Sequence, residues 1–262
     1  MNIPRSAKVL ASRRALDATL PNSLLNDTYS KIFVDDEMLS FAQKTDNPVH
    51  YVLMRHKVLE DYTVGTENFE QILLLGAGLD TKFLRYPSKA KKIIEVDSED
   101  LIRFKQDILT DKQLTQPRSH PLKIQSIEDL KEIINSLDRK KPTAIVAEGF
   151  FMYFEKPLFF QAMQLFTEYF ESYLIGFDML DPSYIESEAN RKIHERLKAS
   201  GEKYFSFTSA KELESTFVKE GIKSKVWYPS SLQKHYYGTN WEGRDDKFVF
   251  VMSNCPDMLT AI

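Results

Sequence analysis

The chain has 262 residues, of which 42% are hydrophobic, with a formal net charge of -3 and an isoelectric point near 6.0. This composition is typical of a globular protein with a sizeable core, and it excludes a strongly basic nucleic-acid-binding surface. Cys255 is the one cysteine, so no internal disulfide forms. With no apolar run of the roughly 18 residues that span a membrane, we expect a cytoplasmic protein that binds neither nucleic acid nor membrane.

The first 65 residues show helical patterns. The start, MNIPRSAKVLASRRALDATL, lacks the apolar segment of a secretory signal; its basic character is shared by some transit peptides, but we interpret it as an amphipathic helix. In DNPVHYVLMRHKVLEDY, Asn47 is placed to cap a helix and Pro48 stands at its first position. His56 falls on the apolar face of this helix and Arg55 near its edge. We expect residues 1–65 to form a helical N-terminal cap.

After Gly65 the pattern changes to strands that alternate with helices, with no helix evident between the last two strands. Such alternation predicts an α/β fold: a seven-stranded, mostly parallel sheet with one antiparallel strand and helices on both faces. We expect this domain to span residues 66–262, with a helical insertion near 182–205. The expected strands are 71–75, 91–97, 121–125, 143–148, 172–178, 223–229 and 246–253.

The stretch EQILLLGAGLDTKFLRY, residues 70–86, joins a buried strand to a turn formed by Gly76, Ala77 and Gly78. Glycines at this place let the backbone approach a ligand closely. The dinucleotide pattern G-x-G-x-x-G requires a third glycine, and Thr81 stands there instead. Because a nucleoside ligand without phosphates does not need the third glycine, the turn favours such a ligand over NAD.

Two carboxylates follow neighbouring strands of the expected sheet. Asp97 ends the second strand, 19 residues after Gly78, where an acidic side chain can accept hydrogen bonds from both ribose hydroxyls. Glu148 ends the fourth strand at the same sheet edge, where a negative group suits a cationic ligand. The structural alternatives are a capping aspartate and a solvated strand end. We favour the nucleoside interpretation because the G-x-G turn and Asp97 have the spacing of such a site and each stands at a strand end.

Three stretches, LLLGAGLDTKFLRY, IEVD and VAEGFFMYF, together resemble the leucine carboxyl methyltransferase family, which includes polyketide-type bacterial O-methyltransferases. The run G-A-G-x-D-T, followed by an arginine five residues after the aspartate, is more specific than a lone G-x-G. The segment LLNDTYSKIF is similar to the family's D-P-Y segment, with Thr28 in place of proline. The resemblance implies a Rossmann-like class I methyltransferase that uses S-adenosyl-L-methionine and releases S-adenosyl-L-homocysteine.

The resemblance also implies roles for individual residues of the cofactor site. Arg55 is similar to the arginine that binds the cofactor's methionine carboxylate, and an N-terminal basic residue, Arg13 or Arg14, contributes. Glu148 corresponds to the glutamate near the cofactor's amino group. The remaining cofactor-binding positions that the resemblance implies are Gly76, Ala77 and Gly78 beneath the methionine and ribose, and Asp97 on the ribose hydroxyls.

Near the adenine the family has Asp-Leu, and Ser126 and Ile127 align with that pair. Because Ser126 stands in place of the family's aspartate, one carboxylate that would bind the adenine is missing. The carboxylate of Glu128 or Asp129 could take over that hydrogen bond. The resemblance makes Tyr153 a tyrosine that faces the acceptor, so Tyr153 and Arg55 are the expected catalytic residues.

The acceptor chemistry follows from the reaction. Methyl transfer from a sulfonium is an in-line displacement that needs the acceptor oxygen held about 3 Å from the methyl carbon. A carboxylate, with a pKa near 4, is ionised at neutral pH, whereas a phenol, with a pKa near 10, gains from a base. No histidine shows metal-ligand spacing, so we expect no metal, and we interpret His235 as an exposed loop residue. We favour a carboxylate over a hydroxyl, on a small molecule or a protein C-terminus.

We expect the cap and the insertion to shape the acceptor pocket. The aromatic residues expected near it suit a hydrophobic or aromatic acid: Tyr29, Phe33, Tyr51, Tyr153 and Tyr184. Two other functions stay open at this point. One is an NAD-dependent oxidoreductase, which the G-x-G turn and Asp97 would support. The other is a non-catalytic nucleoside-binding or scaffold protein of the same fold, against which Arg55, Asp97 and Glu148 argue.

Overall fold

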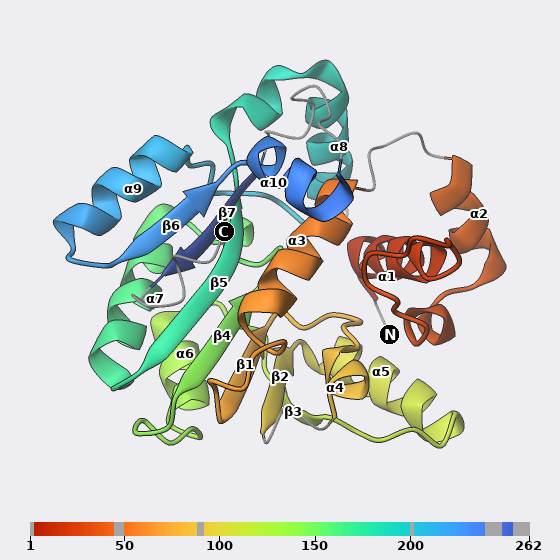
Figure 1. Cartoon of the computed structure of the whole chain (residues 1–262), viewed down its shortest axis with the longest axis horizontal. Helices are drawn as coiled ribbons and strands as arrows, with labels where there is room; N and C mark the ends of the chain where they lie inside the picture. The colour runs from red at the N-terminus through yellow and green to blue at the C-terminus, as the bar shows by residue number, and fades with distance from the viewer. Residues whose placement is uncertain (1–2, 45–49, 88–91, 200–201, 239–247, 254–262) are drawn as a thin grey trace.

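The computed structural model describes residues 3–44, 50–87, 92–199, 202–238 and 248–253 (Figure 1). The helix start expected at Asn47 and Pro48, and Cys255, lie outside these residues. The strands are β1 (Gln71–Leu75), β2 (Ile93–Asp97), β3 (Arg118–Pro121), β4 (Thr143–Ala147), β5 (Tyr173–Leu180), β6 (Ser224–Trp227) and β7 (Phe248–Ser253). The α-helices are α1 (Arg5–Asp17), α2 (Asp36–Lys44), α3 (His50–Tyr62), α4 (Lys82–Arg85), α5 (Glu99–Asp111), α6 (Ile127–Ile134), α7 (Lys156–Tyr169), α8 (Glu188–Ala199), α9 (Ala210–Lys219) and α10 (Pro229–Tyr237), and the 3-10 helices are η1 (Ser30–Phe33), η2 (Phe151–Tyr153) and η3 (Pro182–Glu186).

The seven strands form one sheet in the order β3-β2-β1-β4-β5-β7-β6. Strands β1 to β5 are parallel, and β7 runs antiparallel between β5 and β6. This confirms the predicted mostly parallel sheet with one antiparallel strand. The chain order reverses between β1 and β4, and open α/β sheets bind ligands in the crevice at the carboxyl ends of the strands beside such a reversal.

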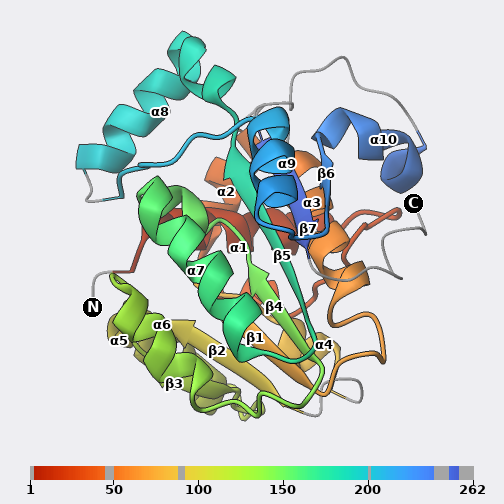
Figure 2. The same cartoon turned by 90° about the vertical axis from the view of Figure 1, so that its left-hand side faces the viewer.

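Two hydrophobic cores lie on the two faces of the sheet. Helices α6, α7 and α9 cover one face (Figure 2), and α3, α5 and α10 supply apolar residues to the other. Strand β1 shows why both faces must be covered, because Ile72 and Leu74 enter one core while Leu73 and Leu75 enter the other. An unbroken apolar run therefore indicates a strand that is buried on both faces of the sheet.

The N-terminal residues are helical, as expected, and they divide into two parts. Helices α1 and α2 pack on each other at the side of the sheet (Figure 1). Helix α3 contacts α1 but also packs against β5 and α10, within the layer of helices that covers the sheet. The boundary at residue 65 between a cap and the larger domain stays a prediction. Among the described residues, no helix combines the length and the apolar character needed to cross a membrane.

Two local predictions are wrong, and each has a physical reason. The third strand is β3 rather than 121–125, because an edge strand that is largely solvent-exposed needs no apolar alternation. Helix α10 connects the last two strands where no helix was expected. Two features of the sequence indicate this helix: Pro229 in its first turn, and Gly238, which takes the left-handed conformation at its end. His235 is exposed as expected, but it lies on this helix and not in a loop.

Candidate active site

A pocket opens at the carboxyl ends of β1 and β4, beside the reversal of strand order. Its floor is the end of β1 with the glycine turn, and its walls come from α3, from the residue after β4 and from α1. The lining residues are Ala7, Leu10 and Arg14 of α1, Arg55 and His56 of α3, Leu74, Leu75, Gly76, Ala77, Gly78, Leu79 and Asp80 of β1 and its turn, and Val146 and Glu148. Five of the predicted site residues thus share one pocket.

The glycine turn has the backbone shape that only glycine adopts readily. Gly76 and Gly78 have φ angles of 63° and 53°. A Cβ atom on Gly76 would lie 2.7 Å from Cδ2 of Phe150, so this position also lacks room for a side chain. The amide of Gly78 donates to Oδ2 of Asp97 at 2.8 Å, which ties the turn to the end of β2.

Asp97 lies beside the pocket rather than in its lining. Its carboxylate accepts hydrogen bonds from the amides of Gly78, at 2.8 Å, and Ser98, at 2.7 Å. Burial raises the pKa of Asp97 above its usual value, and the two amide donors oppose that rise. The side chain is thus fixed next to the glycine turn, where a ribose-binding carboxylate is expected.

Arg55 is held between two carboxylates. Its Nε and Nη2 donate to Oε1 of Glu148 at 3.2 and 3.1 Å, and its Nη1 donates to Oδ2 of Asp178 at 2.9 Å. Burial would lower the pKa of Arg55, but Asp178 and Glu148 outweigh burial and raise it. A guanidinium has five N–H donors, of which these contacts use three. Asp178 also accepts from the amide of Gly149 at 2.6 Å, so the left-handed residue after Glu148 is fixed by the same carboxylate.

His56, next to Arg55 on α3, joins Glu148 to further buried charges. Its Nδ1 lies 2.6 Å from Oε2 of Glu148, and its Nε2 lies 3.2 Å from Oε1 of Glu60. Burial raises the pKa of Glu148, but the charges of His56, Lys82 and Arg55 hold it well below its usual range. The glutamate is therefore an anion although it is mostly buried.

His56, Asp80 and Glu148 bring three potential metal-ligand atoms within 4.8 Å of one another. The ammonium of Lys82, which is fully buried, lies 2.5 Å from Asp80, 3.4 Å from Glu148 and 3.2 Å from Nε2 of His56. A divalent ion at this place would have to displace Lys82 from all three. We therefore interpret the group as an internal ion-pair network.

The network continues through α4 to α1. Arg85 donates to Glu60 at 3.0 Å, and its Nε lies 3.7 Å from Oδ1 of Asp27. Arg14 donates to Oδ2 of Asp27 at 3.0 Å and to the carbonyl of Leu79, in the glycine turn, at 2.7 Å. The N-terminal helices are thus joined to the pocket by buried charges. The members of this buried network are Arg14, Asp27, Arg55, His56, Glu60, Asp80, Lys82, Arg85, Glu148 and Asp178.

Ser126 and Ile127 are not in the pocket lining. Ser126 caps α6: its hydroxyl accepts from the amide of Asp129 at 3.2 Å, and the Asp129 carboxylate accepts from the Ser126 amide at 2.8 Å. This reciprocal arrangement is a capping box, so the Asp129 carboxylate already serves the helix start. A contact of Ser126 or Ile127 with an adenine stays a prediction.

Tyr153 lies on η2, outside the pocket lining, in a group of aromatic rings. Its ring centroid is 5.2 Å from that of Tyr204, and Tyr204 lies 6.0 Å from Tyr184 and 5.4 Å from His194. Burial raises the pKa of Tyr153 to about 12. The phenol therefore keeps its proton near neutral pH, and it can donate a hydrogen bond but cannot serve as a base.

Several network residues were not predicted from the sequence, although some of them left a signal. His56 looked like part of an apolar helix face. Asp178 is a carboxylate inside the otherwise apolar strand YLIGFDML. Asp80 and Lys82 lie within the quoted run after the glycine turn, but nothing in the sequence shows that a lysine there is fully buried. Arg14 was named as an alternative to Arg13, and of these two it is Arg14 that lines the pocket.

The family model of leucine carboxyl methyltransferases matches residues 7–161, which hold the glycine turn, Arg55, Asp97 and Glu148. The chain belongs to this family. A relative from Mycolicibacterium paratuberculosis, whose name describes an S-adenosyl-L-methionine-dependent methyltransferase, is 29% identical over 175 residues, which cover 58% of each chain. One from Mycolicibacterium smegmatis with a similar name is 26% identical over 173 residues, again 58% of each. The chain thus spans about 58% of the length of these curated relatives.

Solved structures show the same fold as this family member. A DUF574 family protein from Streptomyces avermitilis has a TM-score of 0.56 at 14% identity, with 97% of this chain and 98% of that chain covered. A SAM dependent methyltransferase from Archaeoglobus fulgidus has a TM-score of 0.53 at 16% identity, with 84% and 100% covered. These likenesses confirm the predicted class I methyltransferase fold.

The crowding at Gly76 predicts a specific loss of stability. Gly76→Ala and Gly221→Ala both place an alanine at positive φ, which costs about 1–2 kcal/mol, but only Gly76 faces an obstacle, whereas Gly221 has open space. We expect Gly76→Ala to lower the free energy of unfolding in urea by about 1–3 kcal/mol more than Gly221→Ala does. Equal losses in the two variants would show that Phe150 does not confine the turn.

The network also predicts how stability depends on pH. Burial raises the pKa of Glu60, but His56 and Arg85 outweigh it and lower the pKa to about 2, below the ordinary 4.5. Stability from this carboxylate is present above pH 4.5 and is lost as the pH falls toward 2, by about 3 kcal/mol in all. Denaturant unfolding between pH 6 and pH 2.5 measures this loss. We expect Glu60→Gln to be less stable at pH 6 with a shallower acid dependence; an unchanged slope would contradict the assignment.

Proposed function

We propose that the protein is an S-adenosyl-L-methionine-dependent O-methyltransferase that acts on a carboxylate, or alternatively a hydroxyl, of a small molecule or a peptide C-terminus. The observation that supports this most is the Arg55–Glu148 ion pair in the pocket wall above the glycine turn. An amino acid is a zwitterion, so an adjacent cation and anion are complementary to its carboxylate and its ammonium. The methionine end of the cofactor is such a zwitterion.

The residues around this pair fit the rest of the cofactor. Arg55 has N–H donors beyond those that bind Glu148 and Asp178, and these would bind the carboxylate. Asp97, fixed by the Gly78 and Ser98 amides, would accept from the ribose hydroxyls. When bound, the cofactor supplies a methyl group on a positively charged sulfur. The chain's own part is to hold the acceptor oxygen in line and to exclude water.

The arrangement after the glycine turn argues against NAD. Pyrophosphate binding uses a third glycine and the N-terminus of a long helix. Here Thr81, which is buried, accepts a hydrogen bond from Nε of Arg85 at 3.2 Å, and α4 has only four residues. The side chain at that position is thus part of the internal structure, with no room made for a phosphate.

The aromatic group around Tyr153 supports an acceptor site beside the cofactor pocket. Because the phenol rings of this group are largely buried, they provide apolar surroundings, which favour an acceptor with an apolar or aromatic body. The Nε2 atom of His194 is buried and has no hydrogen-bond partner among the residues that the structure describes, which leaves it free for a polar group of the acceptor. Because Tyr153 can donate but not accept a proton near neutral pH, a carboxylate acceptor suits it better than a phenol.

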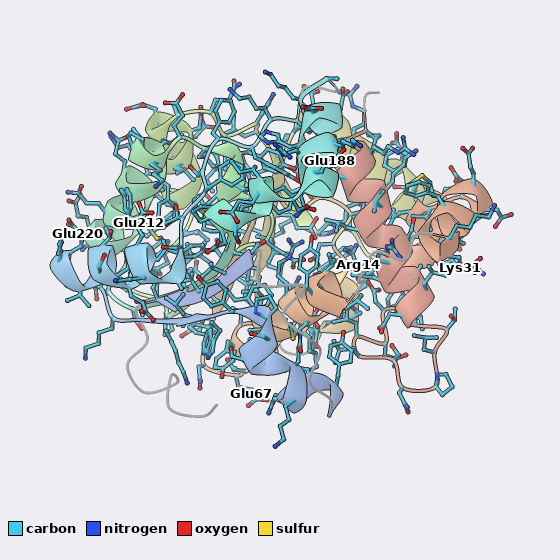
Figure 3. The ribbon with its side chains drawn as sticks, turned by 90° about the horizontal axis from the view of Figure 1, so that it is seen from above. Arg14, Lys31, Glu67, Glu188, Glu212 and Glu220 are labelled. Carbon is cyan, nitrogen blue, oxygen red and sulfur yellow. The ribbon has the colours of Figure 1, made fainter. Side chains whose placement is uncertain are left out.

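Cofactor binding tests the proposal directly. We expect isothermal titration to show that S-adenosyl-L-methionine and S-adenosyl-L-homocysteine bind and NAD does not. Asp97→Ala should weaken both adenosyl ligands at least tenfold, because it removes charge-assisted hydrogen bonds. Glu212→Gln is the control: Glu212 pairs with Lys156 on the surface, and it lies on α9, across the molecule from Arg14 on α1 (Figure 3). Binding of NAD alone would overturn the proposal.

The acceptor side predicts a separate behaviour. With an acceptor found in a panel of carboxylic acids and phenols, we expect Tyr153→Phe to lower kcat at least tenfold while the affinity for S-adenosyl-L-methionine stays within twofold. Turnover should be nearly constant from pH 6 to pH 9, since a carboxylate needs no deprotonation. A rate that rises steadily toward pH 9 would indicate a phenolic acceptor instead.

A further inference from the structure

His56 is the residue with the most charged neighbours in the pocket wall, and neither the family resemblance nor the proposed mechanism gives it a role. It is 1% exposed. Three carboxylates face its ring: Glu60 from its own helix, Asp80 from the glycine turn and Glu148 from the end of β4. Helix α4 adds two cations, Lys82 and Arg85, each 3.2 Å from Nε2.

The two ring nitrogens have different surroundings. The nearest atom to Nδ1 is Oε2 of Glu148 at 2.6 Å, and an ionised carboxylate can only accept a hydrogen bond, so Nδ1 carries a proton. Nε2 faces two donors, Lys82 and Arg85, as well as the carboxylate of Glu60. Lys82 also lies near Nδ1, but at 3.4 Å it is farther from that nitrogen than Glu148 is. The 2.6 Å contact thus assigns Nδ1–H as a donor toward Glu148.

Glu148 is therefore held by a different side chain at each oxygen. Arg55 donates twice to Oε1, and His56 donates to Oε2. Lys82 also reaches Oε2, but at 3.4 Å it is the longest of these contacts, and its ammonium already lies 2.5 Å from Asp80. Without His56, Oε2 would keep only the 3.4 Å contact with Lys82, and the carboxylate could turn toward that ammonium.

We propose that His56 is a positioning residue whose Nδ1–H holds the Glu148 carboxylate in the orientation that binds the cofactor's ammonium group. This rests on the proposed function, because it concerns the same cofactor site. The weak contact to Lys82 leaves Oε2 able to take a ligand ammonium, while His56 and Arg55 keep the carboxylate in place. A buried carboxylate that cannot rotate loses no freedom when the ligand binds.

Two amide variants separate the role of Nδ1 from that of Nε2. The side-chain nitrogen of asparagine can reach the place of Nδ1, whereas that of glutamine reaches the place of Nε2. We expect His56→Asn to bind S-adenosyl-L-methionine within threefold of the wild type, and His56→Gln and His56→Leu to bind at least tenfold more weakly by isothermal titration. The melting temperature of each ligand-free variant reports the purely structural effect.

The outcomes are distinct. Equal weakening in His56→Asn and His56→Gln, in step with their melting temperatures, would show a structural role only and overturn the inference. A wild-type protein that binds no adenosyl ligand would instead refute the proposed function. If the variants fail to fold, nitrogen NMR of the wild-type protein still tests the inference. We expect nitrogen NMR to show a protonated Nδ1 whose resonance moves when S-adenosyl-L-methionine is added; an unprotonated Nδ1 would overturn the inference.

Discussion

The buried network of ion pairs is the constraint on which the rest of this structure depends. Removing a charge from water is expensive, and a buried charge persists only when partners satisfy it on every side. Loss of one partner of a buried pair typically costs about 3–5 kcal/mol, because the other charge is left without compensation. The elements that supply these charges must therefore take one relative position. That requirement fixes α1, α3 and α4 around the end of the sheet.

The sheet topology explains why the charges meet where they do. Reversal of strand order between β1 and β4 opens a crevice at their carboxyl ends, and the apolar strands place their first polar residues there. Glu148 follows β4, and the glycine turn follows β1. Arg14 then binds both Asp27 and the Leu79 carbonyl, so α1 is held over the turn by a hydrogen bond to its backbone. One edge of the sheet thus holds the turn, the ion pairs and the covering helix.

The parts of the site that follow directly from strand ends were predictable, and the parts that depend on packing were not. The turn at Gly76, the carboxylate of Glu148 and the presence of seven strands all follow from apolar runs that end at glycine or polar residues. Burial of Lys82 could not be predicted, because no local pattern distinguishes a buried charge from an exposed one. His56 was placed on an apolar helix face, but its charged partners Asp80, Lys82 and Glu148 come from elements distant in the sequence. The third strand was misplaced because β3 lies at the sheet edge and is largely exposed, so it lacks the hydrophobic pattern of a buried element. Helix α10 was missed because Leu232, which is buried in the core, is the one aliphatic residue among its nine.

The central claim is that Arg55 and Glu148 act as one unit that binds the zwitterionic end of the cofactor. A double-mutant cycle of Arg55→Met and Glu148→Gln, read by the dissociation constant of S-adenosyl-L-methionine, tests it most directly. We expect each single variant to bind at least tenfold more weakly, and the double variant to bind much less weakly than the product of the two effects, since each single change leaves a buried charge unpaired. Independent, multiplicative effects, or no effect of either change, would contradict the account.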